Sequence, residues 1–442
     1  MQFDEALRYL LSLGHETLAI KLGLRNTELL LAALGDPQRS YPAVQIAGTN
    51  GKGSTAVVLD SICAAAGIKS GLFTSPHLVS ITERVRIGGQ EISRELFAQH
   101  AIRIRDAAQR LVDHGEIEVL PTFFEQVTAI ALLAFREAKV DLAILETGLG
   151  GRLDSTSAAK AELVAITPIA IDHEEYLGNT LESIAAEKAA IIRPGVTAII
   201  APQSAQALEV ILRQCKRSNV QPSITSFPVR LEGTSADGRC CATFETRQDR
   251  YEHVLIGLRG RHQTTNVAVA IRLAESLPVS VPRWAIIEGI ERASHSGRLE
   301  LWKTKPPFLF DGAHNTAGAK ALRDYLDEFV KMPLTMVFGA MRDKNLDELA
   351  AILFGAANQL VLTRSENERA ASIEKLREVA SRVVDQGKIS TADSVKDAIR
   401  IALDITPQDG IVCFTGSLYL IGDAQSASKE IISAESENSN AR

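Results

Sequence analysis

The sequence predicts an α/β fold with two domains: a mostly parallel sheet with a small antiparallel insertion, followed by a second α/β domain. Three observations predict it. Short apolar runs alternate with helical patterns over most of the chain, the segment from about 228 to 258 alternates residue by residue instead, and a second strand–helix series begins after Gly297. Repeated strand–helix alternation is typical of mostly parallel sheets that are covered by helices.

The strands expected in the first domain are short apolar runs, which is the pattern of strands buried on both faces. We place them at 43–47, 140–146, 163–167 and 197–201. Helical patterns lie between the strands, including those at about 54–66 and at 180–192. The antiparallel insertion is expected to contain strands at 240–246 and 251–256, on either side of Arg247-Gln248-Asp249. The first domain is expected to span residues 1–296.

The second domain is expected to span residues 297–442. Its predicted strands lie at 308–310, 335–338, 360–363 and 411–414. Helices are expected between them, near 314–330, 345–354, 372–385 and 393–403. The polar segment from about 427 onward is expected to be frayed, because it offers little apolar surface to bury.

Composition excludes several classes of protein. The 442 residues carry 48 Lys and Arg against 54 Asp and Glu, a net charge of −6, which argues against nucleic acid or a membrane surface as a partner. No apolar stretch approaches the roughly 20 residues that span a bilayer, and the N-terminal segment lacks the pattern of a secretory signal. The five cysteines are scattered and odd in number, so we expect a reducing, cytoplasmic location.

A glycine-rich loop joins the predicted strand at 43–47 to the helix that follows. Glycines let backbone N–H groups turn toward phosphate oxygens, and the helix N-terminus and Lys52 add positive charge. Gly53 separates Lys52 from Ser54, so the strict P-loop pattern is not met. A tight turn with an incidental lysine is the alternative, but the strand before the loop and the helix after it favour phosphate binding. The residues expected to bind phosphate are Thr49, Asn50, Gly51, Lys52, Gly53 and Ser54.

A second glycine cluster, Gly148 to Leu153, follows the predicted strand at 140–146. It is similar to a dinucleotide fingerprint, but Leu153 stands where a third glycine would allow a helix to pack closely. We therefore reject a dinucleotide site. We expect this turn to let backbone approach a ligand beside Glu146.

Glu146 and His173 come at or just after the ends of two predicted strands. Ligand sites in open α/β sheets collect at the carboxyl ends of strands, so both side chains are expected near the phosphate loop. Mg²⁺ prefers oxygen ligands, which makes Glu146 a natural ligand and His173 a less usual one. A histidine that only caps or hydrogen-bonds within its loop is an equal alternative.

Lys188 falls on the apolar stripe of the helix predicted at 180–192, four residues after Ile184 and seven after Leu181. A lysine that points into a core is disfavoured unless it is paired or its pKa falls. A neutral amine can act as a nucleophile or a base, or react with CO₂ to give a carbamate. A side chain that reaches past the stripe to solvent is the alternative.

The second domain has a polar cluster where a predicted strand ends and a helix begins, at Asp311-Gly312-Ala313-His314-Asn315. Capping of that helix by Asp311 or Asn315 is the simpler interpretation. Thr415-Gly416-Ser417 repeats the strand–turn–helix arrangement. Arg298, near the domain junction, is placed to reach a phosphate across it.

Together these segments resemble the folylpolyglutamate synthase/dihydrofolate synthase family of the Mur ligases. The resemblance spans nearly the whole chain and implies a P-loop ATPase-type sheet domain followed by a Rossmann-like domain. The matching segments include Leu22-Gly23-Leu24, Gly48 to Ser54, Thr74 to Leu78, Thr122 to Glu125, Gly148 to Asp154, Asp172-His173, Glu187-Lys188, Gly260 to Asn266, Gly297 to Glu300, Asp311 to Asn315, Asp343-Lys344, Arg369-Ala370 and Thr415 to Ser417.

The resemblance implies an ATP-dependent ligase. ATP would phosphorylate a carboxylate to give an acyl phosphate and ADP, and the amine of L-glutamate would displace the phosphate. The acceptor would be dihydropteroate, a reduced folate or both. The cofactors would be ATP and two Mg²⁺. The protein is expected to be a monomer. Two other activities stay open: a Mur-type amino-acid ligase acting on a non-folate carboxylate, and a nucleotide-binding switch without a ligase step.

The resemblance also implies roles for residues at matching positions. Ser75, Glu146 and His173 would hold Mg²⁺, and a carbamylated Lys188 would help to bind a second ion. Beside the phosphate loop, the ATP site would include Asn266, Arg298 and Asp311, with Asn266 against adenine. The catalytic residues would be Lys188 and His314, the latter near the incoming glutamate with Ser417. The pterin-bearing substrate would lie against Thr122, Phe123, Phe124, Glu125, Arg152, Leu153 and Asp154.

The chain departs from the family pattern at several positions, while the phosphate and metal positions are intact. Valine is usual at Thr147, asparagine at Ser157 and a Trp-Pro pair at His295-Ser296. The other departures stand where proline or aspartate is common, at Thr316, Asn345 and Lys21. These departures concern which acceptor binds and whether both family reactions take place.

Overall fold

The computed structural model describes residues 2–14 and 23–440, so Lys21 and Leu22 lie outside the described residues. Its largest sheet consists of β1 (Ala43–Ala47), β2 (Ser70–Phe73), β3 (Val85–Ile87), β4 (Gln90–Glu91), β5 (Leu142–Glu146), β6 (Leu163–Ile166), β7 (Thr197–Ile200) and β8 (Ser223–Ile224). Their order is β4-β3-β2-β5-β1-β6-β7-β8. All pairings are parallel except those of β3 with β2 and with β4. The mostly parallel sheet expected from the sequence is confirmed.

Helices cover both faces of this sheet, because its strands alternate apolar side chains between the two faces. On one face, α3 (Lys52–Ala65), α9 (Gln263–Glu275) and α10 (Arg283–Arg292) form a core with Val44 and Ile46 of β1. The other face is covered by α1 (Phe3–Ser12), α2 (Arg25–Ala33), α4 (Arg94–Asp113), α5 (Phe123–Ala138), α7 (Leu181–Ala189) and α8 (Ala205–Arg217). Short helical turns complete this part of the chain: η1 (Pro37–Arg39), η2 (Ile81–Arg84), η3 (Ser155–Ala159) and α6 (Glu174–Leu177).

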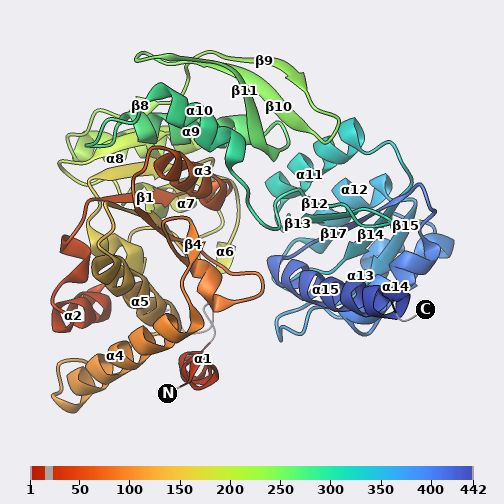
Figure 1. Cartoon of the computed structure of the whole chain (residues 1–442), viewed down its shortest axis with the longest axis horizontal. Coiled ribbons are helices and arrows are strands. Elements are labelled where there is room, and N and C mark those ends of the chain that lie inside the picture. The colour runs from red at the N-terminus through yellow and green to blue at the C-terminus, as the bar shows by residue number, and fades with distance from the viewer. Residues whose placement is uncertain (1, 15–22, 441–442) are drawn as a thin grey trace.

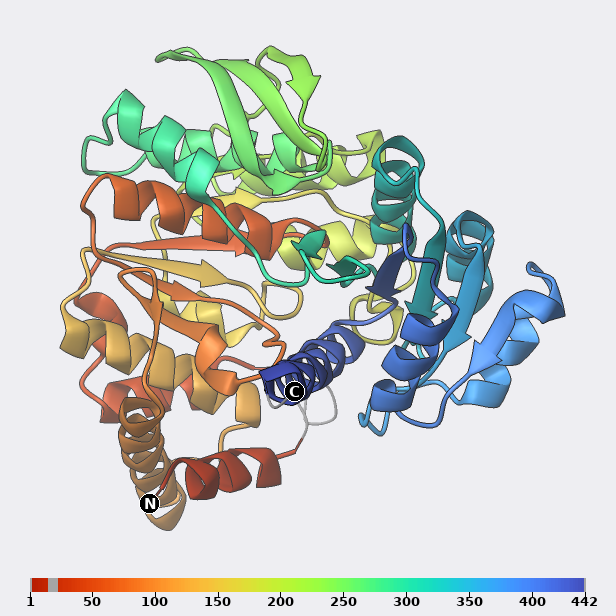
Figure 2. The ribbon, with the colours of Figure 1, turned by 45° about the vertical axis from the view of Figure 1, so that its right-hand side comes forward.

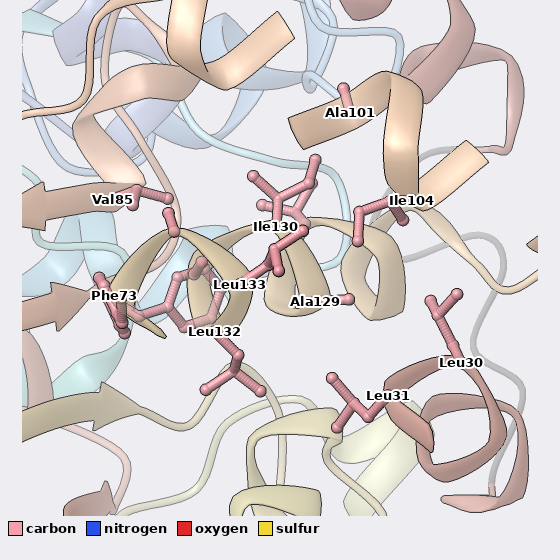
Figure 3. Close-up of a cluster of buried hydrophobic side chains, with 14 of the residues drawn as sticks. Leu30, Leu31, Phe73, Val85, Ala101, Ile104, Ala129, Ile130, Leu132 and Leu133 are labelled. Carbon is pink, nitrogen blue, oxygen red and sulfur yellow. The ribbon is translucent and has the colours of Figure 1, made fainter. Parts of the chain in front are cut away.

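Figure 3 shows the core under α4 and α5. Leu30 and Leu31 reach it from α2, Phe73 from β2 and Ile104 from α4, and none of the four exposes any side-chain surface. At about 25 cal/mol per Å² of buried apolar area, side chains of this size each contribute roughly 1.5–3 kcal/mol. This packing fixes α5 against the sheet, so that the N-terminus of α5 lies at the carboxyl edge of the strands.

The antiparallel insertion has three strands, β9 (Val229–Thr234), β10 (Arg239–Glu245) and β11 (Arg250–Arg259). β10 and β11 are the two expected strands, whereas β9 was not predicted. Val254 and Ile256 of β11 pack into the same core as α9 and α10. The insertion therefore forms a cap over one helical layer (Figure 1).

The third sheet consists of β12 (Glu300–Trp302), β13 (Phe308–Asp311), β14 (Leu334–Phe338), β15 (Gln359–Leu362), β16 (Ile389–Thr391) and β17 (Ile411–Thr415), in the order β12-β13-β17-β14-β15-β16. Only the edge strand β12 is antiparallel to its neighbour. The helices and turns on its two faces are α11 (Thr316–Phe329), α12 (Leu346–Leu353), η4 (Phe354–Ala356), α13 (Ile373–Ala380), η5 (Gln386–Lys388), α14 (Val395–Ile405) and α15 (Leu418–Asn440). The second α/β series is confirmed, while a boundary at 297 stays a prediction.

The C-terminal segment differs from the expectation. Instead of fraying from about 427, the chain stays helical to Asn440 in α15. Ala427 and Ile431 pack against the core beside α14, and Lys396 of α14 pairs with Glu430 at 3.1 Å. These contacts give the polar segment an apolar stripe that its composition conceals. Within residues 2–14 and 23–440, no helix combines the length and apolar character needed to cross a bilayer.

Candidate active site

One cavity of about 540 Å³ lies where the carboxyl ends of the first sheet face the third sheet. Residues from both halves of the chain line it. Of the residues predicted for the site, it gathers Thr49, Asn50, Gly51, Lys52, Gly53, Ser54, Ser75, Thr122, Phe124, Glu125, Glu146, Arg152, Leu153, Asp154, His173, Lys188, Asn266, Arg298, Asp311, His314 and Ser417. Phe123 is the predicted site residue that is not among the lining residues.

The glycine-rich loop at 48–54, which is predicted to bind phosphate and is called the phosphate loop here, opens into this cavity, and α3 begins at Lys52 with its N-terminus directed there. Gly51 has φ +87°, a conformation that favours glycine, and a Cβ at this position would lie 2.1 Å from Oδ1 of Asn266. Asn266 is buried and donates to Oε1 of Gln263 at 2.8 Å. The close approach to Asn266 and the positive helix end together suit a polyanion such as a nucleotide phosphate.

His295, one of the departures from the family pattern, lies against the phosphate loop. Its Nδ1 is 3.2 Å from Oγ of Ser54, and a Cβ on Gly53 would lie 2.9 Å from its Cε1. Burial, helped by the charge of Arg298, lowers the pKa of His295 to about 3. The imidazole is therefore neutral near pH 7 and adds no charge beside the loop.

Glu146 ends β5 next to the start of α3. Its Oε2 accepts a hydrogen bond from the amide of Ser75 at 3.0 Å, and a Cβ on Gly53 would lie 3.2 Å from the same oxygen. Burial raises the pKa of Glu146, against the charge of Lys52 and the Ser75 hydrogen bond. A cation bound here would offset that burial cost, because it stabilises the carboxylate form.

The oxygen donors beside Glu146 suit a magnesium ion that is held partly by the protein and partly by the phosphates of a bound molecule. In the part of the chain that the structure describes, no three His, Cys, Asp or Glu side chains lie close enough to form a metal cage by themselves. Mg²⁺ is usually bound by one or two carboxylates, with waters and substrate phosphates supplying the other oxygens. The Glu146 carboxylate and the Ser75 hydroxyl beside a phosphate loop match that arrangement.

His173 precedes the short helix α6 with φ 53°, a left-handed conformation that is uncommon outside glycine but that histidine adopts more often than most residues. Burial lowers the pKa of His173 to about 4. The negative charge of Asp172 opposes this shift, and the positive charge of Lys344 adds to it. A neutral imidazole keeps a free lone pair at pH 7, which a metal ligand needs. The structure thus places His173 in the cavity in a suitable protonation state.

Lys188 is 4% exposed on α7, so the structure excludes the alternative in which it reaches solvent. Burial lowers its pKa to about 7, and the charge of Lys52 acts in the same direction. A substantial fraction of the amine is therefore neutral near pH 7. The apolar stripe of α7 correctly predicted the burial.

Asp172 connects the two halves of the cavity. Its Oδ1 lies 2.7 Å from Nζ of Lys344, and its Oδ2 accepts from Nδ2 of Asn315 at 2.9 Å and lies 3.5 Å from Nε2 of His314. Burial alone would raise the pKa of Asp172, but the bond from His314 and the nearby positive charges hold it far below its usual range. Asn315 also donates to Oδ1 of Asn50 in the phosphate loop at 3.1 Å.

The cluster at the start of α11 is held by its own backbone. Asp311 accepts from the amides of Leu299 (2.9 Å) and Ala313 (3.0 Å), and burial raises its pKa against the charge of Arg298. Asn315 caps α11 through the amide of Gly318 at 2.9 Å, so the simpler interpretation of Asn315 holds beside its contact with Asp172. Nδ1 of His314 donates to the carbonyl of Gly312 at 2.8 Å, which turns Nε2 toward Asp172.

Thr122 to Glu125 form a capping box at the N-terminus of α5. The Thr122 amide donates to Glu125 at 2.8 Å, and Thr27 donates to the same carboxylate at 3.0 Å. Phe124 lines the cavity, where a Cβ on Gly148 would meet its ring at 2.4 Å. Phe123 packs into the core instead, with Arg84 over its ring at 5.4 Å.

The turn from Gly148 to Asp154 is built around buried acceptors. Oδ2 of Asp154 accepts from the amide of Leu149 at 2.9 Å, and burial raises the pKa of Asp154. Arg152 pairs with Glu187 at 3.0 Å at the cavity wall. The departures Thr147 and Ser157 both accept from the buried Nε2 of Gln45, at 3.3 and 2.8 Å.

Sequence reasoning did not assign roles to several residues of the cavity. His262, Tyr176 and Tyr419 line it, and Lys344 and Arg369 supply positive charge on its second-domain wall. Arg369 pairs with Asp343 at 3.0 Å. The matches at Asp343-Lys344 and Arg369 were visible in the sequence, but their partners were not.

The fold and the cavity define a Mur ligase. The family model described as the Mur ligase middle domain matches residues 46–274, and the model described as the Mur ligase glutamate ligase domain matches residues 297–418. Within that class, the chain belongs to the folylpolyglutamate synthase/dihydrofolate synthase family, as the relatives below show.

The chain is 34% identical over 419 residues to the dihydrofolate synthase/folylpolyglutamate synthase of Bacillus subtilis, covering 93% of this chain and 96% of that protein. It is similar to a structure of Escherichia coli FolC in complex with DHPP and ADP, with a TM-score of 0.86, 30% identity and 98% of both chains covered. A bifunctional folylpolyglutamate synthase/dihydrofolate synthase with Mn, AMPPNP and L-glutamate bound matches with a TM-score of 0.84, 28% identity, and 97% and 98% of the two chains covered.

Proposed function

We propose that this protein joins L-glutamate to a pterin substrate, dihydropteroate or a reduced folate, in an ATP-dependent, ADP-forming reaction. The single observation that carries the proposal is the composition of the cavity. A phosphate loop and Glu146 form one wall, and the cationic and hydroxyl side chains of the second domain form the other. The names of the related proteins supply the pterin and the glutamate.

The first wall positions the nucleotide and activates the acceptor. Lys52 and the α3 N-terminus hold the terminal phosphates, and Asn266 lies against the loop where a base is expected. A Mg²⁺ held by Glu146, Ser75 and His173 would neutralise charge on the transferring phosphoryl group. The acceptor carboxylate, beside Phe124 and the Gly148–Asp154 turn, takes that phosphoryl group and becomes an acyl phosphate.

The second wall presents the amino acid. Lys344 and Arg369 offer positive charges for its carboxylates, and Ser417 a hydroxyl at the start of α15. The amine attacks the acyl carbon, a C–N bond forms and the C–O bond to the phosphoryl group breaks, and the departing inorganic phosphate takes up the proton that the amine loses. His314, whose two nitrogens face the carbonyl of Gly312 and the carboxylate of Asp172, lies beside the attacking amine and helps to position it. Because acyl phosphates react with water, contact between the two walls at Asp172 keeps the reaction centre closed.

Lys188 is proposed to carry a carbamate. The neutral amine of a buried lysine attacks CO₂ and loses one proton, which converts a costly buried ammonium into an anionic oxygen donor. Such a donor would hold a second Mg²⁺ in the same cavity.

The five cysteines, all free thiols in the structure, support a cytoplasmic location. That the protein is a monomer stays a prediction.

The test is incubation with ATP, Mg²⁺, L-glutamate and one pteroate at a time, followed by mass spectrometry of the products. We expect a product that carries one more glutamate, and ADP released only when both co-substrates are present. ADP release without either co-substrate would instead indicate a nucleotide switch. Glutamylation of a non-folate acid alone would indicate another Mur-type ligase.

A further inference from the structure

The loop at 74–80, between β2 and η2, is tied at both of its ends. Near its start the amide of Ser75 donates to Glu146 at 3.0 Å. Near its end three consecutive amides, at 78–80, donate to the carboxylate of Glu83 at 2.8, 2.8 and 2.6 Å. The loop is therefore anchored to the Glu146 side of the cavity at its start and to Glu83 of η2 at its end.

Leu78, in the middle of this loop, packs into the core of the second α/β unit. Every other described member of that core lies between residues 302 and 431. The Leu78 side chain lies between the junction and α15: a Cβ on Gly297 would be 3.1 Å from Cδ1 of Leu78 and 3.2 Å from Cγ2 of Ile421. Figure 2 shows α15 running alongside this region of the first unit.

Gly422 of α15 approaches the backbone of Leu78 as closely as a glycine permits. A Cβ on Gly422 would lie 1.9 Å from the carbonyl oxygen of Leu78 and 2.7 Å from its carbonyl carbon. Both neighbours are backbone atoms, so no side-chain rotation makes room for an added methyl group.

The junction and α15, both of which Leu78 contacts, are also linked to each other by hydrogen bonds. Glu300 accepts from the amide of Gly297 at 2.8 Å and from the side chain of Gln425 at 2.7 Å, which joins the junction to α15. α15 starts beside Ser417, and both Ser417 and Ser75 line the cavity. The contact of Leu78 with Gly422 thus connects the loop that carries Ser75 to the helix that begins beside Ser417, from outside the cavity.

We propose that Leu78 and Gly422 are positioning residues, whose contact sets the distance between the Ser75 loop and the Ser417 end of α15. This inference rests on the proposed ligase function. It predicts that the contact matters most for glutamate addition, which needs both walls, and much less for nucleotide binding, because most of the predicted nucleotide ligands lie on the first wall. Neither residue touches the reacting groups, so the effect passes through Ser75 and Ser417.

The test compares Gly422→Ala with the wild type in three measurements: kcat/KM for glutamate, the Kd for ADP, and hydrogen exchange of the amides at 75–80. Alanine favours helix more than glycine does, so the variant does not weaken α15 itself. We expect kcat/KM to fall on the order of 100-fold, as a misplacement of about 1 Å costs. We expect the ADP Kd to change far less than kcat/KM, and the loop amides of residue 75 and residues 77–80 to exchange faster, residue 76 being a proline without an amide hydrogen.

Glu430→Ala, an exposed change on α15 beside Lys396, is the matched control and is expected to alter none of the three. If Gly422→Ala does not fold, Leu78→Ala, which removes the packed side chain without adding an atom, is expected to change kcat/KM and exchange in the same direction. Normal kcat/KM and normal exchange in these variants would overturn the inference. A wild type that forms no product with any pteroate would instead overturn the proposed function, and exchange alone would then decide whether the contact positions the loop.

Discussion

The Asp172 carboxylate and the Lys344 ammonium, 172 residues apart in the chain, lie 2.7 Å from each other across the cavity. Both side chains are largely buried, at 7% and 11% exposed. Asp172 also accepts a hydrogen bond from Asn315, which in turn contacts the phosphate loop at Asn50. The nucleotide wall and the amino-acid wall are thus joined through one carboxylate.

Replacing Lys344 with methionine should weaken this connection. The change leaves the buried Asp172 carboxylate without its closest cation, and breaking one side of a buried pair costs about 3–5 kcal/mol. We expect kcat/KM for glutamate to fall by at least about 100-fold, the equivalent of about 2.7 kcal/mol, with little change in ADP affinity. Steady-state kinetics and a calorimetric ADP titration measure the two effects. Lys375→Met removes a lysine from an exposed pair with Glu378 and should be neutral; a loss of the same size there would contradict the explanation.

Lys188→Ala should abolish ligase turnover, because it removes the atom that would carry the carbamate. If the lost group is a carboxylate-like oxygen donor, millimolar formate or acetate should restore part of the rate by occupying the space. The measurement is product formation against carboxylate concentration. Lys52→Ala, which removes a phosphate-binding cation instead, should not be restored. Full activity of Lys188→Ala without any additive would show that the lysine has no role in the reaction.

The buried Lys188 amine should also make stability depend on pH. Burial lowers the pKa of Lys188 in the folded protein to about 7, whereas an exposed lysine has a pKa of about 10.5. Between these two values the unfolded chain binds more protons, so the free energy of unfolding rises with pH. One proton gives a slope of at most about 1.4 kcal/mol per pH unit. We expect the difference in unfolding free energy between wild type and Lys188→Met, measured by urea denaturation in CO₂-free buffer, to rise between pH 7.5 and 9.5 in favour of the wild type. A difference that stays flat over this range would contradict the burial of an uncharged amine.

The Thr122 to Glu125 segment should separate stability from substrate binding. Thr122→Ala loses a side-chain cap and should lower the free energy of unfolding by about 1 kcal/mol. Phe124→Ala should raise KM for the pterin acceptor and leave ADP affinity unchanged, since its ring faces the cavity beside Gly148. Ser204→Ala removes a comparable cap from α8, away from the cavity lining, and should destabilise without changing that KM. An unchanged acceptor KM in Phe124→Ala would remove this residue from the acceptor site.

The local hydrophobic pattern predicted most of the parallel strands. Strands that are buried on both faces appear in the sequence as short continuous apolar runs, and few other elements give that pattern. The strand β9 escaped prediction because none of its residues is buried, so it shows no alternation of buried and exposed side chains. The edge strands β12 and β16 have only three residues each. The tail from about 427 was expected to fray because its composition does not reveal that Ala427 and Ile431 pack against the core beside α14.

A site residue could be predicted where its signal lies in neighbouring sequence positions. It could not be predicted where its role depends on a contact with a residue far away in the chain. Lys52 and its loop carry their signal in consecutive residues, and Lys188 carries its signal in the period of its helix. The Asp172–Lys344 pair has no local signal, because only the packing of two sheets brings the residues together. Phe123 and Phe124 are neighbours in sequence, yet the helix turns one into the core and the other into the cavity.

In the proposed reaction, one cavity couples a phosphate loop to glutamate transfer onto a pterin acid. The most direct measurement is mass spectrometry of a reaction containing the wild-type protein, ATP, Mg²⁺, L-glutamate and either dihydropteroate or a reduced folate. We predict an acceptor extended by glutamate with one ADP formed for each bond, and no ADP when glutamate or acceptor is omitted. Absence of any extended pterin product, with ADP released at the same rate whether or not glutamate is present, would contradict the account.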